Sequence, residues 1–304
     1  MAGRQITFAA AGILVLTAVS AHAQSLKLVL EKGRAYRQIT TRTGNTESSA
    51  QNATQTAEQE ITTAIAWHVK EVEPSGNMRV TIETEWWTAK QTLPFGNVSF
   101  DSRNGGTIPA GLHVHAALAS VAPSVTVDRT GRIVTIHNAD ELRRELAKRS
   151  PTLGADHEAA FTDDTLKRHI GSPPVILPAK PMRPGQEWTG TRELSELAGP
   201  DADHTFTLQN LTDDRFTVSV SARLDDRGAG GNEPKASGGG LKLKGRLAGQ
   251  FVLDRESGWI LSGEETFVAE GVMTLAVPGV EKPIQIPTKV KTVRRVQPAE
   301  DNSQ

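Results

Sequence analysis

Five prolines fall between residues 173 and 184, and this connector constrains the fold more than any other stretch of the chain. Proline fixes the backbone φ angle and lacks an N–H donor, so this spacing excludes both an α-helix and a central β-strand. The residue before each proline is pushed toward extended conformations. We therefore expect an extended connector that ends at Gly185 and runs across the surface of the molecule.

Two short helices are predicted before the connector. Asn138 is a favourable N-cap residue for the first helix, and Leu142 and Leu146 share one face of it because they lie four residues apart. A second helix is predicted to start near Thr162, with acidic residues in its first turn, basic residues in its last turn and Gly171 beyond its end. We expect the Leu142/Leu146 face to pack onto the β-structure around it.

The chain on both sides of this middle shows the period-two alternation of antiparallel strands. A turn at residues 74–77 separates residues 61–73 from residues 78–90, which predicts a hairpin. One face of its second arm should carry Val80, Ile82, Thr84 and Trp86. Further expectations are a strand at residues 26–30, a turn at 33–36 that leads into a strand through residue 43, and a loop or solvent-facing strand at 44–58. After the hairpin we expect turns at 93–111, a short helix at 112–121 and final strands at 266–275 and 283–296.

Three elements recur in the same order in both halves of the chain, which indicates an internal duplication. Each half has a Gly-x-x-aromatic opening, a hairpin, and a strand–turn–strand unit whose turn contains Asp and Gly. In order, the pairs are Gly33–Tyr36 with Gly185–Trp188, residues 61–90 with residues 206–224, and Asp128 and Gly131 with Asp254 and Gly258.

The first 23 residues are predicted to be a signal peptide. Arg4 supplies a positive charge, residues 6–19 are apolar, and Ala21-His22-Ala23 is a small-x-small cleavage site that would leave Gln24 as the first mature residue. The apolar run is shorter than the roughly 20 residues that a membrane-spanning helix needs. The sequence contains no cysteine, so we expect no lipid anchor and no disulfide. The protein should be periplasmic in a Gram-negative host and secreted otherwise.

These patterns predict a mainly β protein. We expect two related antiparallel curved sheets, arranged like an open barrel or a sandwich, with a short helical segment between them. The predicted organisation after the signal peptide is an N-terminal β half (residues 24–138), a helical and proline-rich connector (139–184), a C-terminal β half (185–297) and a disordered tail (298–304).

The half-repeats, the phrase Leu177-Pro178 … Pro181 … Gly185-x-x-Trp188 and the stretch Phe100–Arg103 resemble a family of exported bacterial proteins known only as a domain of unknown function. The resemblance covers most of the mature chain and implies no activity. The curved-sheet plan is also similar to the lipoprotein-carrier folds of the periplasm. That similarity is one of fold, and fold does not determine function.

Catalytic, metal and cofactor signatures are absent from the sequence. Neither a nucleophile elbow nor a Ser-x-x-Lys pair is present, and Gly238–Gly240 lacks the lysine that would complete a phosphate-binding loop. His113 and His115 would point the same way on a strand, but no third ligand follows at a diagnostic spacing. We predict no metal and no cofactor. The net charge of −1 argues against a nucleic-acid partner.

Trp86 and Trp87 form the most distinctive pair of residues. Neighbouring strand residues point to opposite faces, so one ring should be buried and the other should face outward or line a cleft. With Trp67, these residues are our candidate ligand-binding set: Trp86, Trp87 and Trp67.

Basic residues in the last strand are expected to protect an exposed edge strand against aggregation, with contact to an anionic lipid surface or peptidoglycan as the alternative. They are Lys289, Lys291, Arg294 and Arg295.

The leading functional hypothesis is an exported, non-enzymatic envelope protein. It would bind an apolar small molecule, such as a lipid, or an envelope protein in the concavity of its sheets, without a membrane span after signal cleavage. One alternative is a hydrolase whose catalytic residues are dispersed in the sequence. Another is a structural or assembly factor that acts by strand addition at an exposed edge.

Overall fold

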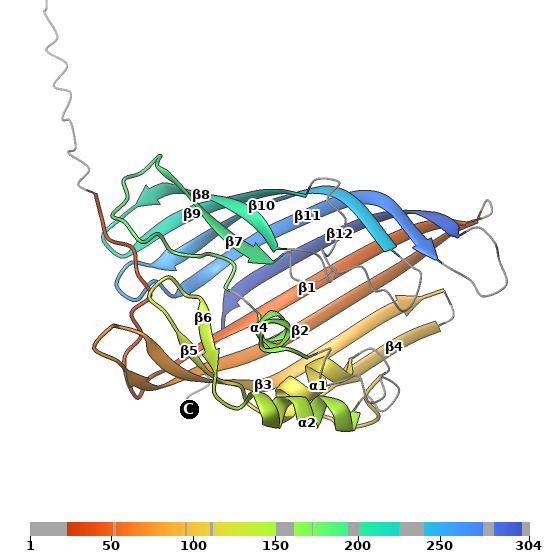
Figure 1. The fold of residues 1–304 in the computed structure, drawn as a ribbon, viewed down its shortest axis with the longest axis horizontal. Coiled ribbons are helices and arrows are strands. Elements are labelled where there is room, and N and C mark those ends of the chain that lie inside the picture. The colour runs from red at the N-terminus through yellow and green to blue at the C-terminus, as the bar shows by residue number, and fades with distance from the viewer. Residues whose placement is uncertain are drawn as a thin grey trace, which may run out of the picture.

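The computed structural model describes residues 23–50, 53–94, 96–109, 112–149, 161–171, 173–193, 201–224, 240–275 and 283–299. These residues form twelve strands and three helices (Figure 1). The predicted signal peptide, apart from Ala23, and residues 300–304 lie outside the described residues. The strands of the N-terminal half are β1 (Ala35–Ala50), β2 (Ala53–Val72), β3 (Met78–Leu93), β4 (Gly96–Asp101), β5 (Ser124–Val127) and β6 (Ile133–Ile136).

The remaining elements complete the sheet and the helical segment. The helices are α1 (His113–Ser120), α2 (Ala139–Arg149) and α4 (Asp163–Ile170). The strands of the C-terminal half are β7 (Glu187–Glu193), β8 (Asp201–Leu211), β9 (Arg215–Leu224), β10 (Gly240–Asp254), β11 (Ile260–Leu275) and β12 (Ile284–Pro298).

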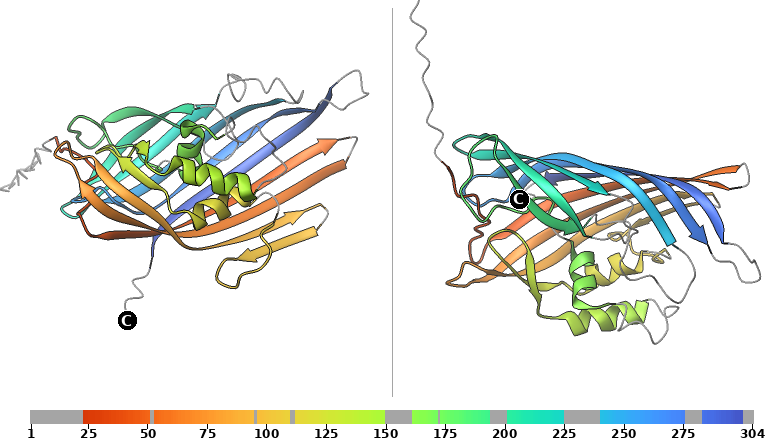
Figure 2. Two further views of the ribbon diagram at one scale, coloured as in Figure 1. Left: turned by 60° about the horizontal axis from the view of Figure 1, so that its bottom comes forward. Right: turned by 45° about the horizontal axis from the view of Figure 1, so that its top comes forward.

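All twelve strands belong to one antiparallel sheet, which confirms the predicted fold class. The strand order is β6-β5-β3-β2-β1-β12-β11-β10-β9-β8-β7, and β4 pairs with the far end of β3. The first and last strands, β1 and β12, are neighbours from Gln38 opposite Pro298 to Ser48 opposite Thr288. The two sheets expected from the sequence are therefore two halves of one sheet. It is strongly curved and carries the helices on one side (Figure 2).

The repeated elements occupy equivalent places in the two halves. Strands β1-β2-β3-β5-β6 are neighbours in that order, and so are β7-β8-β9-β10-β11. Gly33 before β1 and Gly185 before β7 both have a φ of 84°. The side chain of Asp128 accepts a hydrogen bond from the N–H of Thr130, and that of Asp254 accepts one from the N–H of Ser257. Both predicted Asp–Gly turns are thus confirmed.

Both helices predicted before the connector are confirmed, as α2 and α4. The Thr162 hydroxyl accepts a hydrogen bond from the N–H of Thr165 at the start of α4, and Gly171 beyond its end has a φ of 94°. In α2, Leu142 and Leu146 are buried in the main hydrophobic core, as expected. No helix among the described residues has the length and apolarity needed to cross a membrane.

The proline-rich connector differs from the prediction, because part of it is buried instead of running over the surface. Residues 174–178 are buried, with Val175, Ile176 and Leu177 all in the main core. The connector is extended, as predicted, but its polar groups are satisfied by scattered partners. The N–H of Leu177 donates to Thr130, and the indole of Trp188 donates to the Ile176 carbonyl. Burial is possible because prolines leave few N–H groups that need a partner.

The predicted strand at residues 26–30 is wrong, although its alternation is real. Leu26, Leu28 and Leu30 are buried, yet this extended segment joins no strand ladder. The N–H groups of Leu28 and Val29 donate instead to Arg129 and Ser257. These two acceptors belong to the two equivalent Asp–Gly turns, so the segment bridges the two halves.

The polar stretch 44–58 was predicted to be a loop or a solvent-facing strand, and the second alternative is confirmed: residues 44–50 belong to β1 and residues 53–58 to β2, because polar side chains do not prevent backbone pairing. Two further expectations need correction. The turn-rich stretch 93–111 contains β4. The basic residues near the end of the chain do not protect an edge, since β12 pairs with β1 on one side and with β11 on the other.

Candidate ligand-binding site

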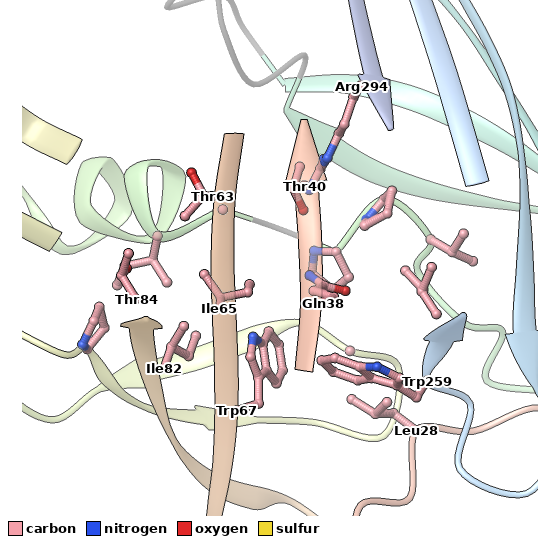
Figure 3. A pocket seen from close by; sticks show the side chains of 18 of the residues that line it. Leu28, Gln38, Thr40, Thr63, Ile65, Trp67, Ile82, Thr84, Trp259 and Arg294 are labelled. Atoms are coloured by element: carbon pink, nitrogen blue, oxygen red, sulfur yellow. The ribbon is translucent and has the colours of Figure 1, made fainter. Parts of the chain in front are cut away.

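A cavity of about 130 Å³ lies between the concave face of the sheet and the helical segment (Figure 3). Its wall on the sheet side comes from β1, β2, β3 and β12, and its opposite wall comes from α1, α4 and the connector. A single water needs roughly 10–15 Å³ of such space, so this cavity accommodates something much larger. It is the place where the N-terminal half, the C-terminal half and the helical segment all meet.

Aromatic side chains form one end of the cavity. Trp67 on β2 is buried, and its ring lies 5.4 Å from that of Trp259 in an edge-to-face arrangement. Trp259 also lies 5.4 Å from Tyr36. Such geometry adds to the energy of burial and holds the rings in place. Figure 3 shows Trp67 and Trp259 beside Leu28 at this end of the cavity.

The indole nitrogen of Trp67 is a buried donor that the described residues leave without a hydrogen-bond partner. The side chain as a whole is 6% exposed. Leaving a buried N–H unsatisfied costs about 1–3 kcal/mol, and buried indoles normally find an acceptor. Because Trp67 lines the cavity, an acceptor atom on a bound molecule would remove this cost.

The structure places the three predicted tryptophans on different faces. Trp67 and Trp87 line the cavity, whereas Trp86 does not. The Trp86 ring instead has the guanidinium carbon of Arg103 4.7 Å from its centre. The prediction that one ring of the pair is buried is confirmed, since Trp87 is 3% exposed.

A β-bulge explains why the buried ring is Trp87 and not Trp86. Ala64 on β2 pairs with Trp86, but Ile65 pairs with Thr84, so Glu85 is an extra residue in β3. One extra residue moves every later side chain to the opposite face. The face predicted to carry Val80, Ile82, Thr84 and Trp86 therefore ends at Thr84 and continues with Trp87.

Trp259 and the buried connector were not predicted to belong to the site. Trp259 follows Gly258 directly, and this glycine has a φ of 68° at the end of the second Asp–Gly turn. The equivalent position after Gly131 is Arg132, so the aromatic residue is a departure from the repeat. This departure from the repeat is the feature of the sequence that could have identified Trp259 as a site residue.

The two histidines of the predicted weak metal motif are separated by the fold. They lie in α1, where residues two apart face different directions, and only His115 lines the cavity. Burial, with smaller contributions from Arg42 and His169, lowers the pKa of His115 to about 4. Among the described residues, no group of three or more histidine, aspartate or glutamate side chains is placed to hold a metal ion.

The far end of the cavity is polar and cationic. The lining there includes Thr40, Thr63, Arg42 and Arg294, and Figure 3 shows Thr40, Thr63 and Arg294 away from the tryptophans. A cavity with an apolar end and a cationic end suits an amphipathic molecule better than a purely polar substrate.

Comparison with known proteins gives one family match. A model described as a family of unknown function (DUF6263) matches residues 75–260, which run from the turn before β3 to the first residue of β11. This range includes Trp87, Trp259 and the connector. No curated protein matches the chain.

Two solved structures show weak likeness to the chain. One is a COG4313 outer membrane channel from Pseudomonas putida F1, with 7% identity over 89% of this chain and 97% of that chain and a TM-score of 0.20. The other is the MucA/MucB complex of Pseudomonas aeruginosa, with 11% identity over 85% of this chain and 93% of that chain and a TM-score of 0.14. At these TM-scores, neither likeness bears on the function of this chain.

Proposed function

The chain belongs to this family of unknown function, DUF6263, and we propose that it is an exported, non-enzymatic envelope protein that binds an apolar small molecule in the cavity beneath its curved sheet. The observation that carries the proposal is the cavity itself. Apolar side chains from the sheet, from the Leu26–Leu30 segment and from the connector converge on it, and Trp67 presents an unsatisfied donor to it.

The backbone hydrogen bonds that fix the Leu26–Leu30 segment beside the cavity support a ligand-binding site and not a packing defect. The N–H of Leu28 donates to Arg129 and that of Val29 donates to Ser257, both over 2.8 Å. Leu28 therefore lines the cavity with its backbone fixed by both turns. Well-packed cores hold few voids larger than a water molecule, so a space this large, framed by such bonds, fits a ligand site.

A small molecule is a better occupant than a protein segment. The wall opposite the sheet is already formed by α4 and by the connector, whose residues Val175 and Leu177 are 2% and 4% exposed. A protein partner would have to displace this layer. The strands at the two ends of the sheet path, β6 and β7, are short, which gives strand addition little support.

Export is the second part of the proposal, and the predicted cleavage site supports it. Gln24, the predicted first mature residue, exchanges backbone hydrogen bonds of 2.7 and 2.8 Å with Met182. We expect the mature protein to begin at Gln24. N-terminal sequencing of protein recovered from the envelope or the medium tests this, and an uncut chain retained in the cytoplasm would contradict it.

A neutral fluorescent probe tests the binding proposal directly. N-phenylnaphthylamine should bind the wild-type protein saturably with a stoichiometry near one. Filling the cavity with Ile65→Trp should weaken binding at least roughly tenfold, a loss of about 1.4 kcal/mol, because Ile65 lines the space.

The matched control is Ile39→Trp, the same change on the opposite face of the neighbouring strand. Its neighbours Gln38 and Thr40 both line the cavity, so Ile39 points away from it. Equal binding by the two variants, or no saturable binding by folded wild-type protein, would refute the proposal. Native mass spectrometry of gently purified protein should additionally reveal a co-purifying mass of lipid size.

A further inference from the structure

The aromatic end of the cavity contains a hydrogen-bond donor in a fixed position. Trp67 is held in the middle of the sheet, because β2 pairs with β1 on one side and with β3 on the other. Its ring also packs edge-to-face against Trp259, with 5.4 Å between the ring centres. The indole N–H is buried, and no residue that the structure describes accepts a hydrogen bond from it. This end of the cavity therefore requires an acceptor that the described chain does not supply.

A second polar side chain on the same wall also lacks a partner. Gln38 lines the cavity and is 8% exposed, and its side-chain amide forms no hydrogen bond with the described residues. Gln38 pairs with Ile65, two residues before Trp67, so Gln38 and Trp67 are diagonal neighbours on adjacent strands (Figure 3). Residues in such positions are about 7–8 Å apart, within reach of aromatic and long side chains. Two buried polar groups without partners thus face the same end of the cavity.

The surroundings of the Trp67 donor favour a neutral acceptor. The side chains that line this end of the cavity carry no charge: they are Leu28, Ile65, Ile82 and Trp259. A carboxylate or phosphate buried among them without a counter-charge costs far more free energy than a neutral polar group. Arg42 also lines the cavity, but it pairs with Ile61, six positions before Trp67 on β2 and about 20 Å along the strand.

We propose that the cavity takes a neutral, otherwise apolar molecule with a carbonyl group, such as an ester or a ketone. Its oxygen accepts one hydrogen bond from the Trp67 indole and a second from the Gln38 amide. This inference rests on the proposed function and names its ligand class. A carbonyl oxygen has two lone pairs, so it can satisfy both donors, and it brings no donor of its own that would need a partner. The apolar part of the ligand packs against Ile65, Ile82 and Trp259.

A matched pair of ligands tests the inference on the full mature chain, by displacement of N-phenylnaphthylamine. Benzophenone has a carbonyl group where diphenylmethane, of similar shape, has a methylene group. The ketone loses more free energy than the hydrocarbon on leaving water. Each affinity is therefore divided by the measured partition of the same compound from water into cyclohexane, which offers no hydrogen bonds. On this scale the wild-type protein should favour benzophenone roughly tenfold or more.

Two variants then assign the donors. Trp67→Phe removes the indole N–H and should lower the affinity for benzophenone roughly tenfold, while the affinity for diphenylmethane changes by less than about threefold. Gln38→Leu should lower the affinity for benzophenone only about threefold, because the Trp67 donor remains. The matched control is Trp86→Phe. Trp86 does not line the cavity, so this change should alter the affinity for neither compound.

Photolabelling locates the carbonyl group without any substitution. On irradiation, the benzophenone oxygen takes a hydrogen atom from a nearby C–H bond, and the carbonyl carbon then forms a bond to that carbon atom. Peptide mapping of the labelled wild-type protein by mass spectrometry should find the adduct around Gln38 and Ile65. An adduct mainly around Arg42 would place the carbonyl at the other end of the cavity and overturn the inference.

The outcomes separate this inference from the proposed function. Equal partition-corrected affinities of the wild type for the two compounds would overturn the carbonyl and leave apolar binding intact. An equal loss of both affinities in Trp67→Phe would show that Trp67 only shapes the cavity, and would also overturn the inference. Binding of neither compound to folded wild-type protein would overturn the proposed function itself. The wild-type comparison decides the question even if Trp67→Phe does not fold.

Discussion

The N-terminal and C-terminal halves of the sheet have the same strand order but fill their concave faces differently. In the C-terminal half, Phe206, Phe216 and Phe251 are fully buried within the main core. Gly263 makes room for one of these rings, since a Cβ there would lie 2.2 Å from a ring carbon of Phe251. In the N-terminal half, Thr63 and other small or polar side chains leave the cavity open.

The difference shows that the strand order does not by itself determine whether the concave face of the sheet encloses a cavity. The same order of strands produces a closed core when large rings fill it and a ligand-sized space when helices cover it from a distance. We infer that the C-terminal half provides most of the stability and that the N-terminal half provides most of the wall of the site. The predictions that follow test this division.

Truncation of a ring in the filled half should have the largest effect on stability. Phe251→Ala should lower the free energy of unfolding by about 3–5 kcal/mol, because it removes a fully buried ring and leaves a cavity. Ile65→Ala should cost less than half as much, since Ile65 already borders an open space. Urea unfolding of both variants measures the difference. Equal losses would contradict the division between the halves.

The next largest effect should come from the buried ion pair. The side chains of Arg192 and Glu265 are 2% and 8% exposed. Glu265→Gln should therefore cost about 3 kcal/mol, because it removes the counter-charge of the buried Arg192 guanidinium.

Glu264→Gln is the matched control for this prediction. The neighbouring Glu264 pairs with Arg295, and both of these side chains are at least half exposed. Exposed pairs contribute about 0–1 kcal/mol. Similar losses for the two variants in denaturant titrations would show that the buried pair has no special role.

Each half also contains a histidine that should make the protein sensitive to acid. Burial lowers the pKa of His115 and of His204 to about 4 in the folded protein. The unfolded chain binds these protons from about pH 6.5 downward. The free energy of unfolding is therefore unaffected by these two histidines above pH 6.5. As the pH falls from 6.5 toward 4, protonation of the unfolded chain lowers it by about 2–3 kcal/mol for each histidine.

Measuring the free energy of unfolding between pH 7 and pH 4 for two variants separates the contribution of His115 to the acid sensitivity from that of His204. His115→Gln and His204→Gln should each flatten the pH dependence of the free energy of unfolding, and their effects should add because the residues lie in different halves. An unchanged profile in both variants would show that other groups cause the acid sensitivity.

The smallest predicted difference compares the two Asp–Gly turns. A Cβ on Gly258 would lie 2.4 Å from the Lys27 carbonyl oxygen, whereas the nearest atom to a Cβ on Gly131 would be a ring carbon of Pro173 at 3.2 Å. Both glycines have positive φ. Gly131→Ala should cost about 1 kcal/mol from backbone strain alone, and Gly258→Ala should cost about 2 kcal/mol because the Leu26–Leu30 segment must also move. Thermal unfolding compares them, and a larger loss at Gly131 would contradict this account of the segment.

Local patterns predicted the elements of this fold well. The helix ends at Thr162 and Gly171, the hairpin turn at residues 74–77 and both Asp–Gly turns are set by neighbouring residues, and the structure confirms them. Each of these features depends on a side chain that binds the backbone nearby or on a glycine with positive φ. Such features are visible in a single sequence.

Features that depend on distant contacts were not predictable. The extra residue Glu85 is fixed by pairing with β2, so nothing in β3 alone shows that Trp87 replaces Trp86 at the cavity. The burial of the connector depends on a space between the sheet and the helices. The Leu26–Leu30 segment has the alternation of a strand, but its partners are two turns that lie far apart in the sequence.

Hydrogen exchange measured with and without saturating N-phenylnaphthylamine tests the central claim most directly. The account predicts slower exchange in the amides that line the cavity, in β2 around Trp67, in α1 and in residues 173–177. It predicts no change in β8 and β9, whose buried rings already fill that half. Protection confined to β8 and β9, or exchange that the probe leaves unchanged everywhere, would contradict the claim that the ligand site lies mainly against the N-terminal half.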